Sequence, residues 1–196
     1  MRSTTGQRRI VVAITGASGS IYGLRLLQLL REVPEVETHV VLSRAGVLTL
    51  KAECGLPPAH LTSQADVVHL VSNIAAPISS GSFRVDAMII APCSVKTASN
   101  IASGNTGDLI SRAADVMLKE RQPLLVAFRE TPLHVGHLET LEKLARLGAI
   151  IFPPVPSFYN RPQTIDDLVN QSCMRMLDQL GIRVEAAPRW GEAVGD

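Results

Sequence analysis

The sequence predicts an α/β fold in which helices cover both faces of a central parallel sheet. Short apolar runs rich in Val and Ile alternate with amphipathic helical patterns along the whole chain. The runs are continuous rather than alternating, which is typical of parallel strands buried on both faces. A glycine-rich turn joins the first run to the first helical pattern. Sheets of this kind bind ligands beyond the carboxyl ends of their strands, so we expect functional residues in the loops that follow the strands.

The alternating pattern defines six strands and six helices. The expected strands are Ile10–Thr15, Thr38–Ser43, Val67–Val71, Ala87–Ala91, Leu124–Phe128 and Ala149–Phe152. The expected helices are Ser20–Arg31, Arg44–Cys54, Val95–Ser103, Leu109–Arg121, His134–Leu147 and Ile165–Leu180. We expect one domain over residues 1–182. Residues 183–196 mix Ala, Pro, Gly and charge, which predicts a loosely ordered tail.

Composition narrows the function classes. The 196 residues can bury a sizeable core, and their net charge of +1 indicates no nucleic-acid or membrane-surface partner. Three cysteines without a C-x-x-C pair, and five histidines without ligand spacing, predict neither disulfides nor a metal site. We expect a cytoplasmic protein, since no apolar run approaches the ~20 residues that span a bilayer and residues 1–9 are too short and polar for a signal peptide.

The loop after the first strand is suited to bind an anion. Gly16, Ala17 and Ser18 lead into a helix, whose first backbone N–H groups and positive dipole end favour phosphate. The spacing of Gly16, Gly19 and Gly23 matches neither the dinucleotide pattern nor a P-loop. A purely structural turn is the alternative, but Ser18 adds a hydroxyl group that a turn does not need. We therefore expect a phosphorylated small molecule or cofactor as ligand.

A second candidate anion site follows the fourth strand. Ser94, Lys96 and Thr97 stand at the start of a helix, where Ser94 would also serve as an ordinary N-cap. Ser43 and Arg44 follow the second strand. Two such sites on neighbouring strands suit a cofactor with a polar ring at one end and a phosphate at the other.

Charged residues near the strand ends predict a reaction that releases phosphate. Arg129 and Glu130 end the fifth strand, where burying charge without a task would be costly. Arg112 and Lys119 are seven residues apart and share one helix face. Cations of this kind stabilise a leaving phosphate, and Tyr159 in a proline-rich loop offers a hydroxyl group. The alternative interpretations are a surface ion pair for Arg129 and Glu130, a solvated helix face for Arg112 and Lys119, and a packed side chain for Tyr159.

Several blocks of sequence together resemble one family, the flavin prenyltransferases of the UbiX/Pad1 type. The resemblance extends from Arg9 to about Ile182. The blocks are T-G-A-S-G-x-x-Y-G (15–23), A-P-I-x-S-G-S (76–82), A-P-C-S-x-K-T (91–97), L-I-x-R-A-A-D-V-x-L-K-E-R (109–121), R-E-T-P-L (129–133) and P-P-V-P-x-F-Y-x-R-P (153–162).

The resemblance implies a flavodoxin-like or Rossmann-like three-layer sandwich, with residues 1–182 as a single FMN-binding domain. It implies a metal-independent transferase that joins the dimethylallyl group of dimethylallyl phosphate, or of the diphosphate, to N5 and C6 of reduced FMN. The prenylated FMN would serve a UbiD-type decarboxylase, in ubiquinone biosynthesis or in aromatic acid decarboxylation. Members of the family usually assemble as homododecamers.

The resemblance also implies roles for single residues. The residues matched to FMN binding are Gly16, Ala17, Ser18, Ser43, Ser94, Val95, Lys96, Thr97 and Arg129. Those matched to the prenyl phosphate are Arg112, Lys119, Arg129, Glu130, Tyr159 and Arg175. Ser18, Glu53, Lys119 and Glu130 are the candidate catalytic residues. The C6 proton would leave either through Glu53 with Ser18 or through the phosphate and Glu130, and both routes stay open.

Two other flavin-related functions are alternatives, and the sequence argues against both. A flavin-dependent cysteine decarboxylase of the same fold would carry P-x-M-N-x-x-M-W, which is absent from 152–160. An FMN carrier that hands flavin to a decarboxylase would not need Arg112, Lys119 and Glu130 together. Ile74 stands where some flavin prenyltransferases place a tryptophan that walls the prenyl pocket, so we expect donor choice or rate to differ rather than the reaction class.

Overall fold

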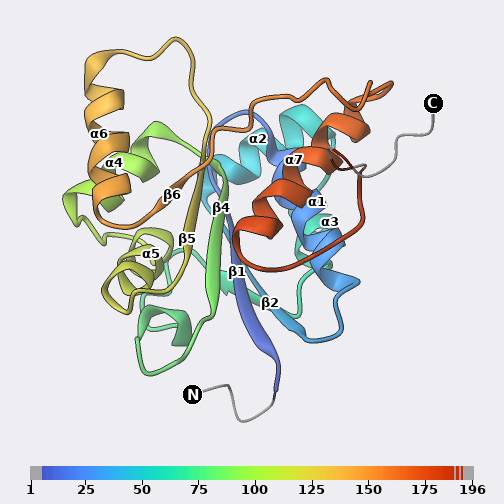
Figure 1. The fold of residues 1–196 in the computed structure, drawn as a ribbon. Coiled ribbons are helices and arrows are strands. Elements are labelled where there is room, and N and C mark those ends of the chain that lie inside the picture. The colour runs from blue at the N-terminus through green and yellow to red at the C-terminus, as the bar shows by residue number, and fades with distance from the viewer. Residues whose placement is uncertain (1–5, 188, 190, 192–196) are drawn as a thin grey trace.

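The computed structural model describes residues 6–187, 189 and 191, and its centre is one parallel sheet (Figure 1). The strand order is β3-β2-β1-β4-β5-β6. The strands are β1 (Arg8–Ile14), β2 (Val36–Leu42), β3 (Val67–Leu70), β4 (Ala87–Cys93), β5 (Leu124–Phe128) and β6 (Ile150–Ile151). The predicted α/β fold with a central parallel sheet is confirmed.

Helices cover both faces of this sheet (Figure 1). The helices are α1 (Ser20–Arg31), α2 (Arg44–Cys54), α3 (Pro58–Thr62), α4 (Val95–Ser103), α5 (Leu109–Lys119), α6 (Val135–Arg146) and α7 (Ile165–Gln179), with a 3₁₀ turn η1 (Pro77–Ser79). The six predicted helices are present within two residues at each end. The sequence pattern missed α3 and η1, which are only one turn long.

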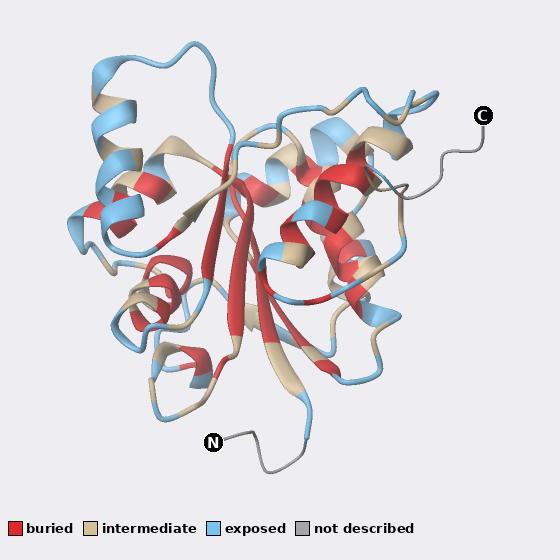
Figure 2. Ribbon diagram, viewed as in Figure 1, coloured by how far each residue is buried: buried red, intermediate tan, exposed pale blue. Residues whose placement is uncertain are grey.

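The two faces of β1 divide the core into two layers. Ile10, Val12 and Ile14 pack with α1, α2 and α7, whereas Val11 and Ala13 pack with α4, α5 and α6. This division follows from the two-residue period of a strand. Both faces are apolar because both are covered, and Figure 2 shows the central strands buried almost throughout.

Side-chain caps begin several of the helices. Ser43 accepts a hydrogen bond from the N–H of Gly46 (2.9 Å), and Asp108 accepts one from the N–H of Ser111 (2.9 Å). Thr164 and Asp167 form a capping box at the start of α7. Each cap satisfies one of the backbone N–H groups that a helix start leaves unpaired. Ser94 caps α4 in the same way. The starts of α2 and α4 directly follow β2 and β4, and the N–H of Leu109 at the start of α5 bonds the carbonyl of Val71 after β3, so all three helix starts lie at the carboxyl edge of the sheet.

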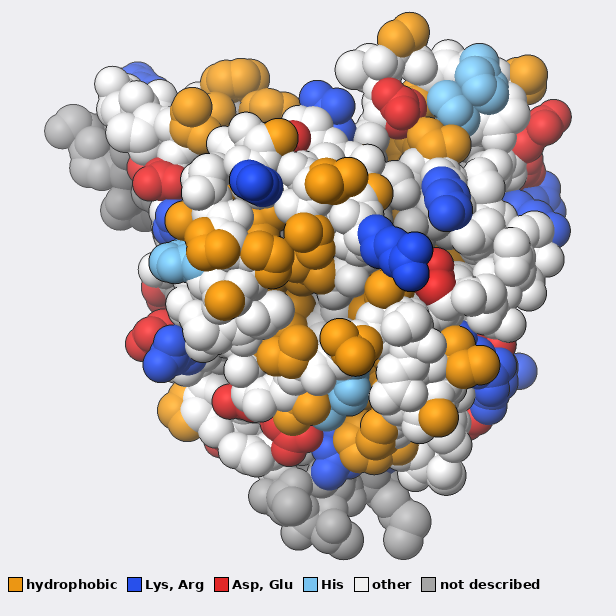
Figure 3. Space-filling model, turned by 180° about the vertical axis from the view of Figure 1, so that it is seen from behind, with side chains coloured by type: hydrophobic (Ala, Val, Ile, Leu, Met, Phe, Trp, Pro, Cys, Tyr) orange, Lys and Arg blue, Asp and Glu red, His pale blue; other side chains and the backbone are white. Residues whose placement is uncertain are grey.

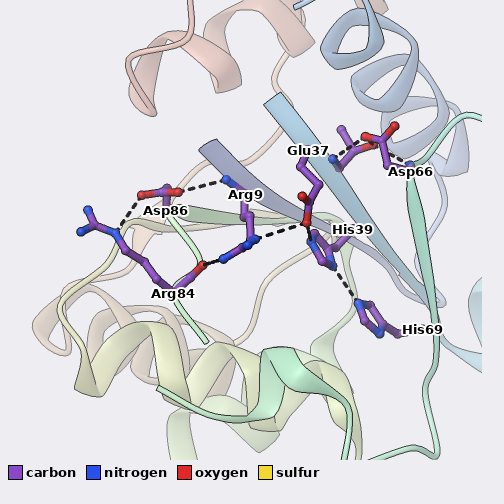
Figure 4. Close-up of polar contacts among 8 residues, drawn as sticks. Arg9, Glu37, His39, Asp66, His69, Arg84 and Asp86 are labelled. Carbon is purple, nitrogen blue, oxygen red and sulfur yellow. Dashed lines mark hydrogen bonds and ion pairs between the residues drawn. The ribbon is translucent and has the colours of Figure 1, made fainter. Parts of the chain in front are cut away.

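A network of polar side chains joins β1, β2 and β3 (Figure 4). His39 contacts His69 on β3 (Nδ1 to Nε2, 2.9 Å) and Glu37 on β2 (2.8 Å). Arg9 pairs with the same Glu37 carboxylate (3.2 Å). Burial lowers the pKa of His39 and of His69, so both imidazoles are neutral at pH 7. The described residues hold no cluster of three potential metal ligands.

The predicted tail over residues 183–196 falls partly on residues 188, 190 and 192–196, which lie outside the described residues. Arg189 bonds both carboxylate oxygens of Asp178 on α7 (2.7 and 2.9 Å). Within the described part of the chain, no helix is both long and apolar enough to cross a bilayer.

Candidate functional site

A cleft of about 370 Å³ opens at the carboxyl edge of the sheet. The chain winds from β1 outward to β2 and β3 and then returns to β4 on the other side of β1, so this cleft lies at the point where the strand order reverses. That point is where open α/β sheets bind their ligands. The lining residues are Gly16, Ser43, Arg44, Ala45, Val71, Ser72, Ser94, Lys96, Thr97, Gly107 and Asp108.

Three helix starts converge on this cleft. Ser43, Ser94 and Asp108 cap α2, α4 and α5, and all three line the cleft. Arg44 and Lys96, both exposed, add positive charge beside the first turns of α2 and α4. Backbone N–H groups, positive dipole ends and two cations make this cleft a site for a phosphorylated ligand.

The first glycine-rich loop differs from the expectation in one respect. The backbone N–H groups of Gly19 and Ser20, at the start of α1, donate to the Glu53 carboxylate (2.9 and 3.0 Å). Gly19 has a φ of 105° and no side-chain cap of its own. Glu53, from α2, therefore takes the place that we expected an anionic ligand to fill, which leaves the starts of α2, α4 and α5 for the ligand phosphate.

Glu53 lies in a cluster with Ser18 and Arg129. Partial burial raises the pKa of Glu53, but hydrogen bonds from the Ser18 hydroxyl and the two N–H groups, with the nearby Arg129 charge, lower it overall. The carboxylate is therefore ionised at neutral pH and already holds the Ser18 hydroxyl. The structure thus brings together two of the candidate catalytic residues and one candidate flavin ligand.

The two charged residues that follow β5 are exposed, although β5 itself is buried through Phe128. The N–H of Arg129 donates to the carbonyl of Cys93 (3.1 Å), which fixes the backbone of β5 against β4. Glu130 accepts a hydrogen bond from the N–H of Thr131 (2.9 Å). Arg129 and Glu130 are both exposed at this edge, so their charges are open to a ligand and carry no large burial cost.

Tyr159 and Arg175 lie on neighbouring elements. The Tyr159 hydroxyl accepts a hydrogen bond from Gln171 of α7 (3.0 Å), one turn before Arg175 on the same helix. Arg175 is exposed and pairs with Asp178 (2.9 Å). The Tyr159 hydroxyl is therefore held one helical turn from Arg175 along α7.

Arg112 and Lys119 are not at the cleft of their own chain. The N–H of Leu109 donates to the carbonyl of Val71 (2.9 Å), so α5 begins at the carboxyl edge and runs back toward the amino edge. Its 11 residues place Lys119 about 15 Å along the helix from its start. Arg112 donates to the carbonyl of Ser79 (3.1 Å), and Lys119 pairs with Glu120.

The remaining predicted residues lie on the loops that border the cleft. Ala17 follows Gly16, and Val95 stands between Ser94 and Lys96, but neither side chain is among the cleft-lining residues. Ser72 and Asp108 also line the cleft, and neither was among the predicted site residues. Asp108 had a detectable signal, since it is an N-cap residue immediately before the apolar pattern that starts at Leu109.

The fold and cleft together define a nucleotide-binding α/β protein of the flavodoxin-like class. Comparison with known proteins makes this specific, because the Flavoprotein family model matches residues 1–177. Flavin prenyltransferase UbiX of Escherichia coli K12 is 51% identical over 185 residues, covering 93% of this chain and 98% of that protein. The mitochondrial flavin prenyltransferase PAD1 of Saccharomyces cerevisiae is 51% identical over 183 residues, covering 93% of this chain and 75% of that protein.

Two solved structures of similar proteins support the same family assignment. A crystal structure of AnUbiX (PadA1) in complex with FMN and dimethylallyl pyrophosphate has a TM-score of 0.93 and 49% identity, covering 94% of this chain and 98% of that one. A dodecameric FMN-dependent UbiX-like decarboxylase from Escherichia coli O157:H7 has a TM-score of 0.91 and 45% identity, covering 93% of this chain and 98% of that one. The chain belongs to the UbiX/PAD1 family of flavin prenyltransferases.

Proposed function

We propose that this protein transfers the dimethylallyl group of dimethylallyl phosphate to N5 and C6 of reduced FMN. The observation that carries the proposal is the Ser18–Glu53–Arg129 cluster beside a phosphate-binding cleft, in a chain about half identical to flavin prenyltransferases. FMN and dimethylallyl pyrophosphate are the ligands bound by AnUbiX.

The donor groups of the cleft fit FMN. Its phosphate needs N–H donors and positive charge, which the starts of α2 and α4 supply together with Arg44 and Lys96. Its polar ring edge needs hydroxyl and backbone partners, which the loops of Gly16 and Ser94 supply. Reduced FMN brings the nucleophilic N5 and C6 atoms, and the protein supplies position, charge and proton transfer.

Cations stabilise the departing phosphate when the C–O bond of the donor breaks. Arg129 directly follows β5 at the carboxyl edge of the chain that forms the cleft. Arg175 stands ten residues into α7, about 15 Å along a helix whose end contacts Arg8 at the start of β1, so we propose that Tyr159 and Arg175 serve the phosphate site as a pair.

Lys119 lies about 15 Å along α5 from the cleft. Arg112, in the first turn of α5, bonds the Ser79 carbonyl and Asp115 and does not line the cleft, so we propose that a second copy of the chain supplies both cations in a homododecamer. Charge that is already in place as the bond breaks lowers the barrier without reorganisation.

Two groups are placed to move the C6 proton. Glu53 is ionised and holds the Ser18 hydroxyl, which makes this pair a general base. Glu130 is exposed at the end of β5 and would act through the leaving phosphate. The hydrogen-bonded geometry of the first pair favours Glu53 with Ser18.

We also propose which enzyme receives the product and where in the cell the protein acts. The prenylated FMN passes to a UbiD-type decarboxylase, and the protein works in the cytoplasm.

Hydrophobic side chains form a broad patch on the face shown in Figure 3. Val68 and Leu70 of the edge strand β3, and Ile74 beyond it, are 52%, 72% and 61% exposed. Apolar exposure of this extent is typical of surfaces that a partner subunit covers.

Anaerobic incubation with reduced FMN and dimethylallyl phosphate tests the activity. The released flavin should gain the mass of one dimethylallyl unit, while a reaction without protein should leave it unchanged. FMN that binds but stays unmodified, with the diphosphate as well, would show that the protein is a carrier or another flavin enzyme.

Mixed oligomers test the contribution of the second copy. Glu53→Gln and Lys119→Ala variants, each impaired alone, are dissociated and reassembled together. Some mixed sites then pair an intact Glu53 with an intact Lys119 from another chain, so activity returns. Activity no higher than the sum of the two variants would contradict a site shared between copies.

A further inference from the structure

Thr15 joins the two loops that border the cleft. Its Oγ1 donates to the carbonyl of Pro92 (2.8 Å) and accepts a hydrogen bond from the N–H of Ser94 (2.8 Å). The Thr15 residue is only 1% exposed. Building on the proposed function, we propose that Thr15 is a positioning residue, which sets the flavin-binding loop after β1 against the flavin-binding loop after β4.

The backbone makes only part of this connection: the N–H of Thr15 donates to the carbonyl of Pro92 (3.2 Å), but the N–H of Ser94, beyond the proline, is held by the Thr15 side chain. The pairing of β1 with β4 ends at Ala13 opposite Ile90, and the register of β4 against β5 shifts between Ile90 and Cys93. Pro92 lies in the irregular stretch and has no N–H to continue the ladder. A hydroxyl group both donates and accepts, so the Thr15 side chain extends the pairing of the two strands beyond the proline.

Neighbouring loops at the same edge are held differently. The N–H of Ser43 donates to the carbonyl of Ile14 (3.0 Å), and the N–H of Arg129 donates to the carbonyl of Cys93 (3.1 Å). Both of these links are backbone to backbone, as is the bond from the Thr15 N–H to Pro92, and they keep their donors in any substitution except one to proline. The bond between Thr15 and Ser94 depends on one side chain, so a single substitution removes it.

The Thr15 hydroxyl acts on the ligand through Ser94. Ser94 caps α4, where its Oγ accepts a hydrogen bond from the N–H of Thr97 (3.4 Å) and contacts the Thr97 hydroxyl (3.1 Å). Lys96 and Thr97 line the cleft, and Gly16 follows Thr15 directly. Without the hydroxyl, the Ser94 N–H loses its partner. The start of α4 then shifts relative to Gly16, and groups on both sides of the cleft lose their alignment with one ligand.

Matched variants separate positioning from stability. Thr15→Val keeps the shape and removes the hydroxyl, whereas Thr15→Ser keeps the hydroxyl. The control is Thr38→Val, because Thr38 is 2% exposed and its hydroxyl also makes two bonds, both to Asp66 (2.8 and 3.0 Å). Thr38 lies four residues before the end of β2, about 13 Å from the carboxyl edge. Asp66 belongs to the network of Figure 4.

The measurements are the Kd for FMN, by flavin fluorescence, and the melting temperature of each variant without FMN. Thr15→Val should raise the Kd about tenfold, as expected when one buried hydrogen bond is lost. Thr15→Ser should stay within about twofold of the native Kd. Thr38→Val should lower the melting temperature and leave the Kd unchanged.

Several results would overturn the proposal. They are a native Kd for Thr15→Val, an equal loss of affinity in Thr38→Val, or a failure of Thr15→Ser to restore binding. If Thr15→Val does not fold, Thr15→Cys is used in its place, because a thiol is a weaker hydrogen-bonding group than a hydroxyl. An unchanged Kd for Thr15→Cys would also overturn the proposal. Since the readout is FMN binding, the result does not depend on prenyl transfer, which is measured separately on the native protein.

Discussion

Replacing Gly23 by alanine should destabilise the protein, although the same change inside a helix usually stabilises it. Gly23 lies in α1, where a methyl group would sit 2.3 Å from Cγ1 of Ile14 and 2.7 Å from the carbonyl oxygen of Ala91. Ordinary contact begins near 3.4 Å, so the helix must move outward by roughly 1 Å. Ile14 is fully buried and the Ala91 oxygen is backbone, so neither can give way.

The size of the effect is the balance of two opposing terms. Gly→Ala at a compatible position stabilises by about 0.4–1 kcal/mol, because it restricts the unfolded chain. Overpacking a core costs about 1–3 kcal/mol. The net loss for Gly23→Ala should be about 1–2 kcal/mol, which lowers the melting temperature of a domain of this size by about 2–8 °C. Displacing α1 also moves Gly19 and Ser20 away from Glu53, so FMN affinity should fall as well.

Thermal unfolding of Gly23→Ala and of a matched variant, Gly136→Ala in α6, provides the assay. At Gly136 the nearest atom to an added methyl group is 3.2 Å away, on the exposed His134 imidazole that caps α6, and that side chain has to shift by only a few tenths of an ångström. That variant should melt at the native temperature or slightly above it. A melting temperature for Gly23→Ala at or above the native value would refute the argument that α1 is pressed against β1 and β4.

Three further predictions concern charge. Glu130→Gln should retain FMN binding and lose most turnover, and unchanged turnover in the same assay would remove Glu130 from the mechanism. The pKa of Glu53 is lowered overall by its hydrogen bonds, so its carboxyl should titrate below the ordinary value of about 4.3. Nuclear magnetic resonance of ¹³C-labelled glutamate carboxyls, with Glu53→Gln to assign the signal, checks this, and a Glu53 signal that titrates near neutral pH would contradict the assignment. Burial lowers the pKa of His39, so the neutral imidazole contributes stability above the unfolded pKa of about 6.5, and this stability is lost as pH falls through the folded pKa. Urea unfolding between pH 7 and 5 should show that the free energy of unfolding falls more steeply with pH for the native protein than for His39→Gln. An equal pH dependence in the two proteins would contradict this prediction.

Much of the fold was predictable because each local signal agreed with the global one. The boundaries of α1, α2 and α4 follow from the sequence, since a cap or a left-handed glycine stands just before the apolar pattern. The helix α3 was missed because it begins at the second of two prolines, Pro58, and its five residues complete barely more than one turn. Strand β6 has only two residues, so its predicted ends at 149 and 152 extended into flanking loops.

The candidate site was less predictable, because it depends on contacts between distant segments. Ser18 and Glu53 are 35 residues apart, and no periodicity in either segment predicts that the carboxylate holds the start of α1. That pairing came from family resemblance, and the structure supplies its geometry. Helical spacing correctly put Arg112 and Lys119 on the same helix, but the direction of α5 carries Lys119 away from the cleft. Ser72 was missed because its role depends on where four loops meet.

The most direct test of the central claim is nuclear magnetic resonance of the flavin product made from dimethylallyl phosphate labelled with ¹³C across the prenyl unit. The account predicts one product in which labelled carbons are bonded to both N5 and C6 of FMN, formed by the native protein under anaerobic conditions. Flavin recovered without bound label, after the native protein has been shown to bind reduced FMN, would contradict the assignment of prenyl transfer to this cleft.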